Sequence, residues 1–243
     1  MTLRITHLYP ELLNTYGDRG NIIALMKRAE WRGIKVTVRR VSLGDPLKAG
    51  ETDWYFIGGG QDAAQLVIAD DLTKRAQILK SDIAFGVPLL AICGGYQLLG
   101  QHYVDPTGQR SAGIGLFDIT TEAGSKRLVG NILIDGIGEF ANQQFIGFEN
   151  HAGRTQLGSS AQPLGRVIQG FGNNGDDRTE GVFTHHAIGT YLHGSLLPKN
   201  PWLTDWFIQT ALEQSQASRP VILKPLDNTF EDQARTEALG RFT

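Results

Sequence analysis

The chain has 243 residues, of which 41% are hydrophobic and 20% are charged, and this ordinary globular composition excludes extensive disorder. Its 23 basic and 25 acidic residues give a net charge of −2, which argues against nucleic acid or a membrane surface as a partner. Because the sequence lacks a transmembrane run, an N-terminal signal core and any cysteine beyond Cys93, we expect a cytoplasmic protein without a transmembrane segment, a disulfide or a multi-cysteine metal site.

The first hundred residues alternate between strand and helix patterns. This alternation predicts an α/β fold with a mostly parallel central sheet and helices on both faces. Ligands of such sheets bind at the carboxyl ends of the strands. Gly58-Gly59-Gly60 and Cys93 each follow an apolar strand pattern and are therefore expected to face one crevice. The strand patterns cover residues 3–9, 34–41 (alternating, as at a sheet edge), 54–57 and 87–92, and the helix patterns cover 21–29, with Asn21 as cap and Gly33 as stop, and 62–85.

From about residue 111 the pattern changes to short strand-like runs separated by turns. We expect this β-rich second half to join the same sheet. A helix is predicted from Pro201, because proline favours the first turn of a helix. Its Trp202/Trp206 and Leu203/Phe207 pairs are spaced i, i+4 and predict an apolar face that packs in the core. The strand-like runs cover residues 116–121, 128–135, 145–149, 181–184 and 188–193.

The strongest local signal is the cysteine, which stands between an apolar strand and a helix-like segment. This is the pattern of a nucleophile elbow, a tight turn that lifts the reactive side chain clear of the sheet. Large side chains two residues before or after the cysteine would clash, and these positions hold Ala91 and Gly95. The start of the helix lowers the pKa of a thiol and offers N–H groups to an oxyanion. We therefore interpret Cys93 as a nucleophile rather than a buried structural cysteine.

A cysteine nucleophile needs a base, and histidine is the usual one. His151 and His193 each follow a strand-like run. A glycine comes directly after His193, and an alanine and then a glycine come after His151. The spacing favours His193 only slightly. The other four histidines lie mid-strand, beside the elbow helix or in a turn, namely His7, His102, His185 and His186.

Several motifs together resemble a known family. The Cys-Gly-Gly-Tyr-Gln segment, the Gly-Gly-Gly after the preceding strand and a late Tyr-Leu-His-Gly resemble class I glutamine amidotransferases, particularly the branch related to cobyric acid synthase. The similarity is closer still to glutaminase subunits of bacterial lipid II isoglutaminyl synthases. It implies an amidotransferase domain over residues 3–210, followed by a C-terminal helical extension or tail over 211–243 in which residues 227–238 carry an amphipathic pattern. The closer similarity rests on residues 21–25, 92–97, 147–151, 189–194 and 197–200.

The resemblance implies that Cys93 is the nucleophile and His193 the general base. Many class I enzymes carry an acid two residues after this histidine, where this chain has Ser195. Either the site works as a dyad or an acid from elsewhere orients the imidazole, with Asp18 and Glu149 as candidates.

The resemblance also implies substrate-binding roles for Arg127 and Gln97. A guanidinium offers the bidentate fork that suits the α-carboxylate of glutamine. The N–H groups of Gly59 and Gly94 are implied as oxyanion donors. Ala91 departs from the family pattern, because many class I enzymes have glycine there. No metal ligand set is predicted.

A glutaminase on a chain of this size implies a partner that uses the ammonia. Amide synthesis requires ATP, and the sequence contains no Gly-x-x-x-x-Gly-Lys-Ser/Thr loop. The resemblance implies a heterodimer with a MurT-type, Mur-ligase-like synthetase subunit that holds ATP and Mg²⁺ and amidates the D-glutamate of the lipid II stem peptide. Three alternatives remain open: a cobyric-acid-synthase-like amidotransferase for another acceptor, a stand-alone cysteine hydrolase, and a catalytically silent binding module.

Overall fold

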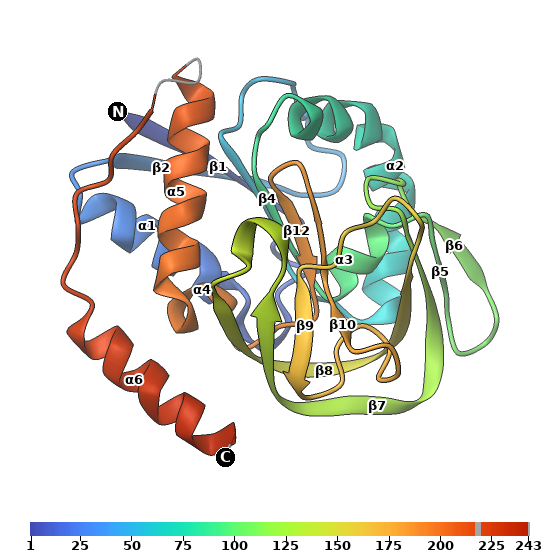
Figure 1. The fold of residues 1–243 in the computed structure, drawn as a ribbon. Coiled ribbons are helices and arrows are strands. Elements are labelled where there is room, and N and C mark those ends of the chain that lie inside the picture. The colour runs from blue at the N-terminus through green and yellow to red at the C-terminus, as the bar shows by residue number, and fades with distance from the viewer. Residues whose placement is uncertain (217–219, 243) are drawn as a thin grey trace.

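A six-stranded sheet forms the centre of the molecule in the computed structural model, which describes residues 1–216 and 220–242 (Figure 1). Its strand order is β11-β12-β4-β3-β1-β2, and all neighbours are parallel except β11 and β12. The predicted parallel sheet is confirmed, with the alternating strand at its edge. The strands are β1 (Thr2–Leu8), β2 (Lys35–Val41), β3 (Trp54–Ile57), β4 (Leu89–Ile92), β11 (Val182–Thr184) and β12 (Ala187–Thr190).

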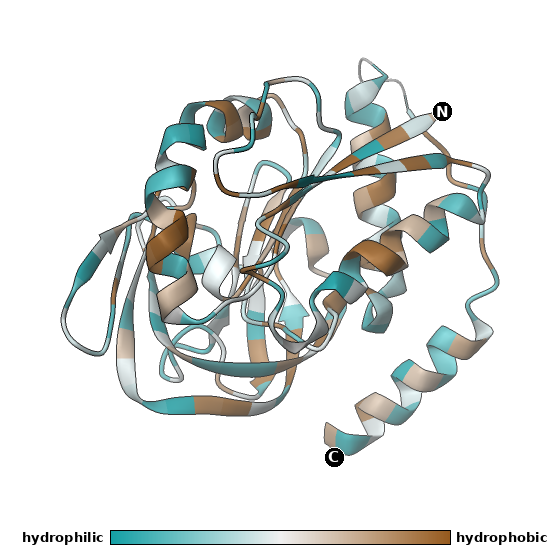
Figure 2. Ribbon diagram, turned by 180° about the vertical axis from the view of Figure 1, so that it is seen from behind, coloured by the Kyte–Doolittle hydropathy of each residue, from teal (hydrophilic) through white to brown (hydrophobic). Residues whose placement is uncertain are grey.

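Helices cover both faces of this sheet, as predicted (Figure 1). Along β3 the side chains alternate: Trp54 and Phe56 enter the core beneath α1 and α5, whereas Tyr55 and Ile57 enter the core beneath α2 and α3. All four are fully buried, because the strand lies between two helical layers. Figure 2 shows apolar colouring in the central strands and in bands on the helices that flank them. The helices are α1 (Arg19–Glu30), α2 (Asp62–Ala84), α3 (Gly94–Leu98), α4 (Leu196–Lys199) and α5 (Pro201–Ser215).

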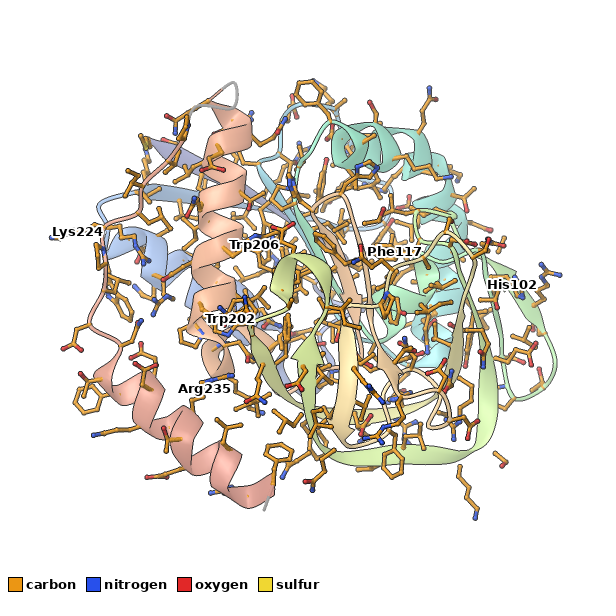
Figure 3. The ribbon with its side chains drawn as sticks, viewed as in Figure 1. His102, Phe117, Trp202, Trp206, Lys224 and Arg235 are labelled. Carbon is orange, nitrogen blue, oxygen red and sulfur yellow. The ribbon has the colours of Figure 1, made fainter. Side chains whose placement is uncertain are left out.

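The apolar face of α5 packs as predicted. Pro201 is its first residue, and Leu203 and Phe207 are fully buried. Trp202 and Trp206 are partly buried and pack edgewise or tilted against the ring of Phe140, with centroids 5.9 and 5.1 Å away (Figure 3). The two tryptophans therefore pack against the core, as expected.

The second half of the chain differs from the expectation that it joins the same sheet. Only β11 and β12 do so, and the remaining strands form a second sheet of order β10-β9-β7-β5-β6, with β8 paired to β7. The long antiparallel β7–β8 hairpin sets the register of this sheet and contains an irregularity between Ala123 and Leu128. The strands are β5 (His102–Val104), β6 (Arg110–Ala112), β7 (Ile119–Gly136), β8 (Gln144–Leu157), β9 (Gly165–Gln169) and β10 (Thr179–Glu180).

Beyond α5, the chain ends in helix α6 (Thr229–Leu239), which lies apart from the sheets (Figures 1 and 2). Arg235 ties it to the body by donating to Asn200 Oδ1 at 2.8 Å and to the Gln144 carbonyl at 2.6 Å (Figure 3). The proposed domain division after residue 210 stays a prediction, and it falls inside α5. None of the described helices is long and apolar enough to cross a membrane.

Candidate active site

Cys93 occupies the sharp turn between β4 and α3. Its backbone φ of 47° and ψ of −104° lie in a region that residues with side chains rarely adopt. The Cys93 N–H donates to the Thr190 carbonyl at 2.9 Å, so the neighbouring strand β12 holds the turn in place. The cysteine is partly buried and lines a cavity. The predicted elbow geometry is therefore confirmed.

The end of β3 and the residue after it leave no room for a side chain at Gly95, two residues after Cys93. A Cβ added to Gly95 would lie 2.8 Å from the Gly58 carbonyl oxygen and 2.9 Å from Ile57 Cγ1. Real Cβ atoms essentially never approach this closely, and the Gly58 carbonyl that would have to move accepts the Gly95 N–H. The position therefore favours glycine, in agreement with the expectation that a large side chain there would clash.

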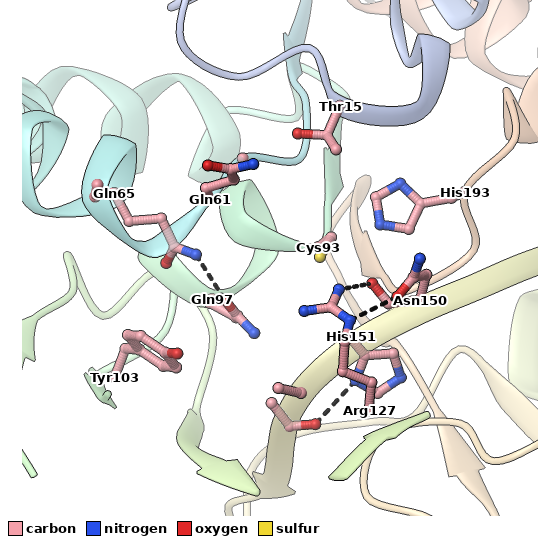
Figure 4. Close-up of a pocket in the computed structure, with 14 residues that line it drawn as sticks. Thr15, Gln61, Gln65, Cys93, Gln97, Tyr103, Arg127, Asn150, His151 and His193 are labelled. Carbon is pink, nitrogen blue, oxygen red and sulfur yellow. Dashed lines mark hydrogen bonds between the residues drawn. The ribbon is translucent and has the colours of Figure 1, made fainter. Parts of the chain in front are cut away.

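His193 follows β12 and faces the same cavity as Cys93 (Figure 4). Two backbone hydrogen bonds hold it: its N–H donates to the Phe148 carbonyl at 2.7 Å, and the Phe148 N–H donates to the His193 carbonyl at 3.2 Å. His193 Nδ1 lies 3.3 Å from Asp18 Oδ1, and both side chains are fully buried. The fold thus brings Cys93, His193 and Asp18 together from three distant segments.

Asp18 lies in the loop between β1 and α1, at the carboxyl edge of the sheet. Its Oδ2 accepts the Gly59 N–H at 2.7 Å, while its Oδ1 faces His193. Its carbonyl accepts both the backbone N–H and the Nδ2 of Asn21 at 3.0 Å. A buried carboxylate held at both oxygens has one orientation. Of the two acids considered from the sequence, Asp18 is the one that reaches His193.

The electrostatic surroundings of His193 favour its charged form. Burial alone would lower the pKa of the imidazole, but the charge of Cys93, hydrogen bonding to Asp18 and Cys93, and the charge of Asp18 together raise it above its ordinary value. A histidine held as the imidazolium can donate a proton to a group that leaves beside it.

The Gly59 N–H is not available as the oxyanion donor that the sequence analysis expects. It donates to Asp18 Oδ2, because a buried carboxylate oxygen takes the nearest donor. The next residue, Gly60, lines the cavity, and its nitrogen lies 3.0 Å from a Cβ built on Gly94. Gly94 begins α3 directly after Cys93. The backbone nitrogens of Gly60 and Gly94 therefore lie beside the elbow, where an oxyanion would form.

Gln97 lies on α3 and lines the cavity with its amide held at both ends. Its Nε2 donates to the Tyr191 hydroxyl at 3.0 Å, and its Oε1 accepts from Gln65 Nε2 at 3.0 Å (Figure 4). Tyr191 Oη in turn lies 2.7 Å from Thr155 Oγ1. Sequence reasoning misses Gln65 and Tyr191, although Gln65 follows the three glycines by about one helical turn and Tyr191 lies two residues before His193.

Arg127 projects from β7 toward the cavity and is exposed. Its Nε donates to Asn150 Oδ1 and its Nη2 to the Asn150 carbonyl, both at 2.8 Å (Figure 4). Asn150 therefore orients the guanidinium over the cavity mouth. A guanidinium in this place can attract a carboxylate.

Glu149 and His151 form a separate buried pair. Glu149 accepts the N–H groups of Phe171 at 2.7 Å and Gly172 at 2.9 Å, and one of its oxygens lies 3.6 Å from His151 Nε2. The His151 ring stacks on Tyr191 with centroids 3.6 Å apart, and burial lowers its pKa. Glu149 is thus engaged away from His193, and the geometry favours His193 over His151 as the partner of Cys93.

The cavity has a volume of about 420 Å³, within the range typical of small-molecule sites. Its lining brings together four of the predicted residues, Cys93, His193, Arg127 and Gln97 (Figure 4). In the part of the chain that the structure describes, no three histidine, cysteine or carboxylate side chains are grouped to hold a metal ion.

Comparisons with known proteins agree with this geometry. A family model for the CobB/CobQ-like glutamine amidotransferase domain matches residues 4–201. The chain is 41% identical over 239 residues to the GatD subunit of the glutamine-hydrolyzing lipid II isoglutaminyl synthase of Staphylococcus aureus, a match that covers 98% of this chain and 96% of that protein. It is 43% identical over 213 residues to the GatD subunit of Streptococcus pneumoniae, covering 87% and 81%. A chain in the structure of PurLQS from Thermotoga maritima has the same fold, with a TM-score of 0.56 and 18% identity over 88% of this chain and 97% of that one.

Proposed function

Because the chain belongs to the CobB/CobQ-like glutamine amidotransferase family, we propose that it hydrolyses the side-chain amide of glutamine to glutamate and ammonia. One observation carries the proposal for this chain: the strained elbow presents Cys93 to His193, and Asp18 holds His193 from behind. Nucleophile, base and orienting acid are the three parts of a covalent acyl-transfer site.

The reaction proceeds through a thioester. The Cys93 thiolate attacks the carboxamide carbon, and the N–H groups of Gly60 and Gly94 stabilise the oxyanion. The intermediate then breaks its C–N bond while His193 gives its proton to the leaving nitrogen, which departs as ammonia. A water attacks the thioester, passes a proton to His193, and the C–S bond breaks to release glutamate. No electron transfer and no co-substrate other than water is needed.

Arg127 supplies the positive charge that draws the α-carboxylate of glutamine into the cavity. Its guanidinium is oriented by Asn150 and lies at the cavity mouth. Gln97, held by Gln65 and Tyr191, forms a wall against which the substrate side chain lies. Both roles follow the sequence expectation and remain proposals.

We further propose that the chain is the glutaminase subunit of a lipid II isoglutaminyl synthase. The two GatD relatives, each covered over more than four fifths of its length, carry this proposal. The ammonia would pass to a MurT-type, Mur-ligase-like partner that holds ATP and Mg²⁺ and amidates the D-glutamate of the lipid II stem peptide to D-isoglutamine. The enzyme would then act in peptidoglycan synthesis inside the cell.

Co-expression with a candidate synthetase tests this function. The purified complex should transfer ¹⁵N from the amide of labelled glutamine to lipid II in an ATP-dependent manner, as read by mass spectrometry. Cleavage of peptide substrates without ammonia release, or ATP turnover by this chain alone, would contradict the proposal.

Gly59→Ala should lower kcat for glutamine hydrolysis by about 10²-fold, because small displacements of catalytic groups have effects of this size. The added Cβ would lie 2.7 Å from His193 Cε1, 3.1 Å from Asp18 Oδ2 and 3.3 Å from Cys93 Cβ, so it would push the three groups apart. Ammonia release at saturating glutamine gives kcat. Gly130→Ala is the matched control, since a Cβ there meets nothing within 4 Å and should leave kcat unchanged.

A further inference from the structure

The side-chain oxygen of Gln65 is a buried acceptor without a hydrogen-bond partner in the described structure. Gln65 lies in the first turn of α2. Only 4% of this residue is exposed, and the residue lines the same cavity as Cys93. A buried acceptor without a partner costs free energy unless a ligand satisfies it.

The neighbouring hydrogen bonds show how the Gln65 amide is oriented. Its Nε2 donates to Gln97 Oε1 at 3.0 Å, and Gln97 Nε2 donates to the Tyr191 hydroxyl at 3.0 Å. A flip of the Gln65 amide alone would place two oxygens against each other. In this arrangement the atom of the Gln65 amide that remains for a bound molecule is an acceptor, Oε1.

The position of Gln65 shows which group of glutamine it meets. Figure 4 places Gln65 and His193 on opposite sides of Cys93. In the proposed reaction the carboxamide nitrogen leaves toward His193, which protonates it. The carboxamide oxygen takes backbone donors at Gly94. The remaining hydrogen-bond donor of glutamine is its α-ammonium group.

The described lining of the cavity offers this ammonium neutral oxygens. Among the described residues that line the cavity, none is an aspartate or a glutamate. An ammonium group is bound in such a place by neutral oxygens. Arg127 would repel the α-ammonium group and attract the α-carboxylate. The charge of Arg127 therefore favours binding of the substrate with its carboxylate near Arg127 and its ammonium group away from it.

Resting on the proposed glutaminase activity, we propose that Gln65 Oε1 accepts a hydrogen bond from the α-ammonium group of glutamine and thereby selects α-amino acid amides. Substrates that lack the amino group leave this oxygen unpartnered. Sites built to hydrogen-bond a substrate group discriminate strongly against analogues that lack it.

The test compares glutamine with 4-carbamoylbutanoate, which is glutamine without its α-amino group, using the full-length chain. For Gln65→Met, kcat/KM with glutamine should fall about 10- to 100-fold, as expected for a lost hydrogen bond to a charged group. With the analogue, kcat/KM should fall far less. The ratio of the two losses isolates the ammonium contact from any effect on Gln97.

Two variants keep the result interpretable. Tyr191→Phe removes the hydroxyl that holds Gln97 but leaves the Gln65–Gln97 hydrogen bond, so its losses of kcat/KM for the two substrates should differ far less than those of Gln65→Met. Gln77→Met makes the same exchange on the exposed side of α2 and should change neither value. Thermal melting checks that each variant is folded.

Equal losses for both substrates in Gln65→Met would overturn the assignment, because the residue would then act only through Gln97. If the losses are equal but the wild-type chain hydrolyses glutamine, the glutaminase proposal still stands. A wild-type chain, tested alone and with its partner, that releases no ammonia from glutamine would remove both proposals.

Discussion

Cys93→Ala should abolish glutamine hydrolysis, with a loss of roughly 10⁶-fold, the size seen when a triad nucleophile is removed. The remaining groups can bind glutamine and polarise its amide, but without the sulfur no thioester forms. Ammonia release from glutamine is the direct measurement. The same variant should also resist alkylation by 6-diazo-5-oxo-norleucine, which mass spectrometry detects as a covalent adduct at residue 93 of the wild-type chain.

The fold should tolerate this change, because the strained turn carries a small side chain in either case. The matched control is Ser195→Ala, which removes the hydroxyl of another residue at a positive φ, two positions after His193, that donates to the Gly17 carbonyl at 2.8 Å. We expect Ser195→Ala to keep the adduct and most of the activity. Undiminished ammonia release by Cys93→Ala would exclude cysteine catalysis and favour a different hydrolytic site.

The part of the site that could be predicted from the sequence is the part that is local. The Cys93 elbow requires an apolar strand, a small residue on each side and a following helix, and all of these lie within a dozen residues. The edge strand β2 and the helix α1 are visible for the same reason, since alternation and stop signals act over short distances.

The pairing of Asp18 with His193 could not be derived in this way, because 175 positions separate the two residues. The sheet rule nevertheless contained a signal. Asp18 lies in the loop that follows β1 and so at the carboxyl edge where Cys93 stands, whereas Glu149 lies inside β8 of the second sheet. Asp18 also explains why Gly59 does not offer its N–H to an oxyanion as predicted, because that N–H donates to Asp18 Oδ2.

The separate second sheet also escaped prediction. Apolar and polar side chains alternate along its strands, as they would along strands added to the first sheet. Composition and period therefore do not distinguish a separate sheet from an extension of the first one. What separates them is the long β7–β8 hairpin, which pairs Ile119 with Leu157 and Asp135 with Gln144. This hairpin carries Arg127, Asn150 and His151 to the cavity, so the side of the cavity that we propose binds the α-carboxylate depends on a register that only the folded structure reveals.

Asp18→Asn should lower kcat for glutamine by about 10⁴-fold and leave KM nearly unchanged, as an amide in place of a triad carboxylate does. The oxygen of the new amide would keep the Gly59 N–H, because the amide nitrogen cannot accept it. The amide NH₂ group would then face His193 Nδ1 and force the proton onto Nε2, the nitrogen that must take the proton of Cys93. The imidazole would be held in the wrong tautomer.

The pH profile of the residual activity gives an independent readout of the same contact. Asp18 is one of the groups that raise the pKa of His193, so its loss should lower that pKa. The imidazolium would then be lost at lower pH than in the wild type, and the alkaline limb of kcat should move in that direction. Asp205→Asn is the control: it removes a partly buried carboxylate that binds Arg28 and Arg32 far from the cavity, so it should lower stability without moving kcat or its pH profile. An Asp18→Asn variant with full kcat and an unmoved profile would reduce the triad to a Cys93–His193 dyad.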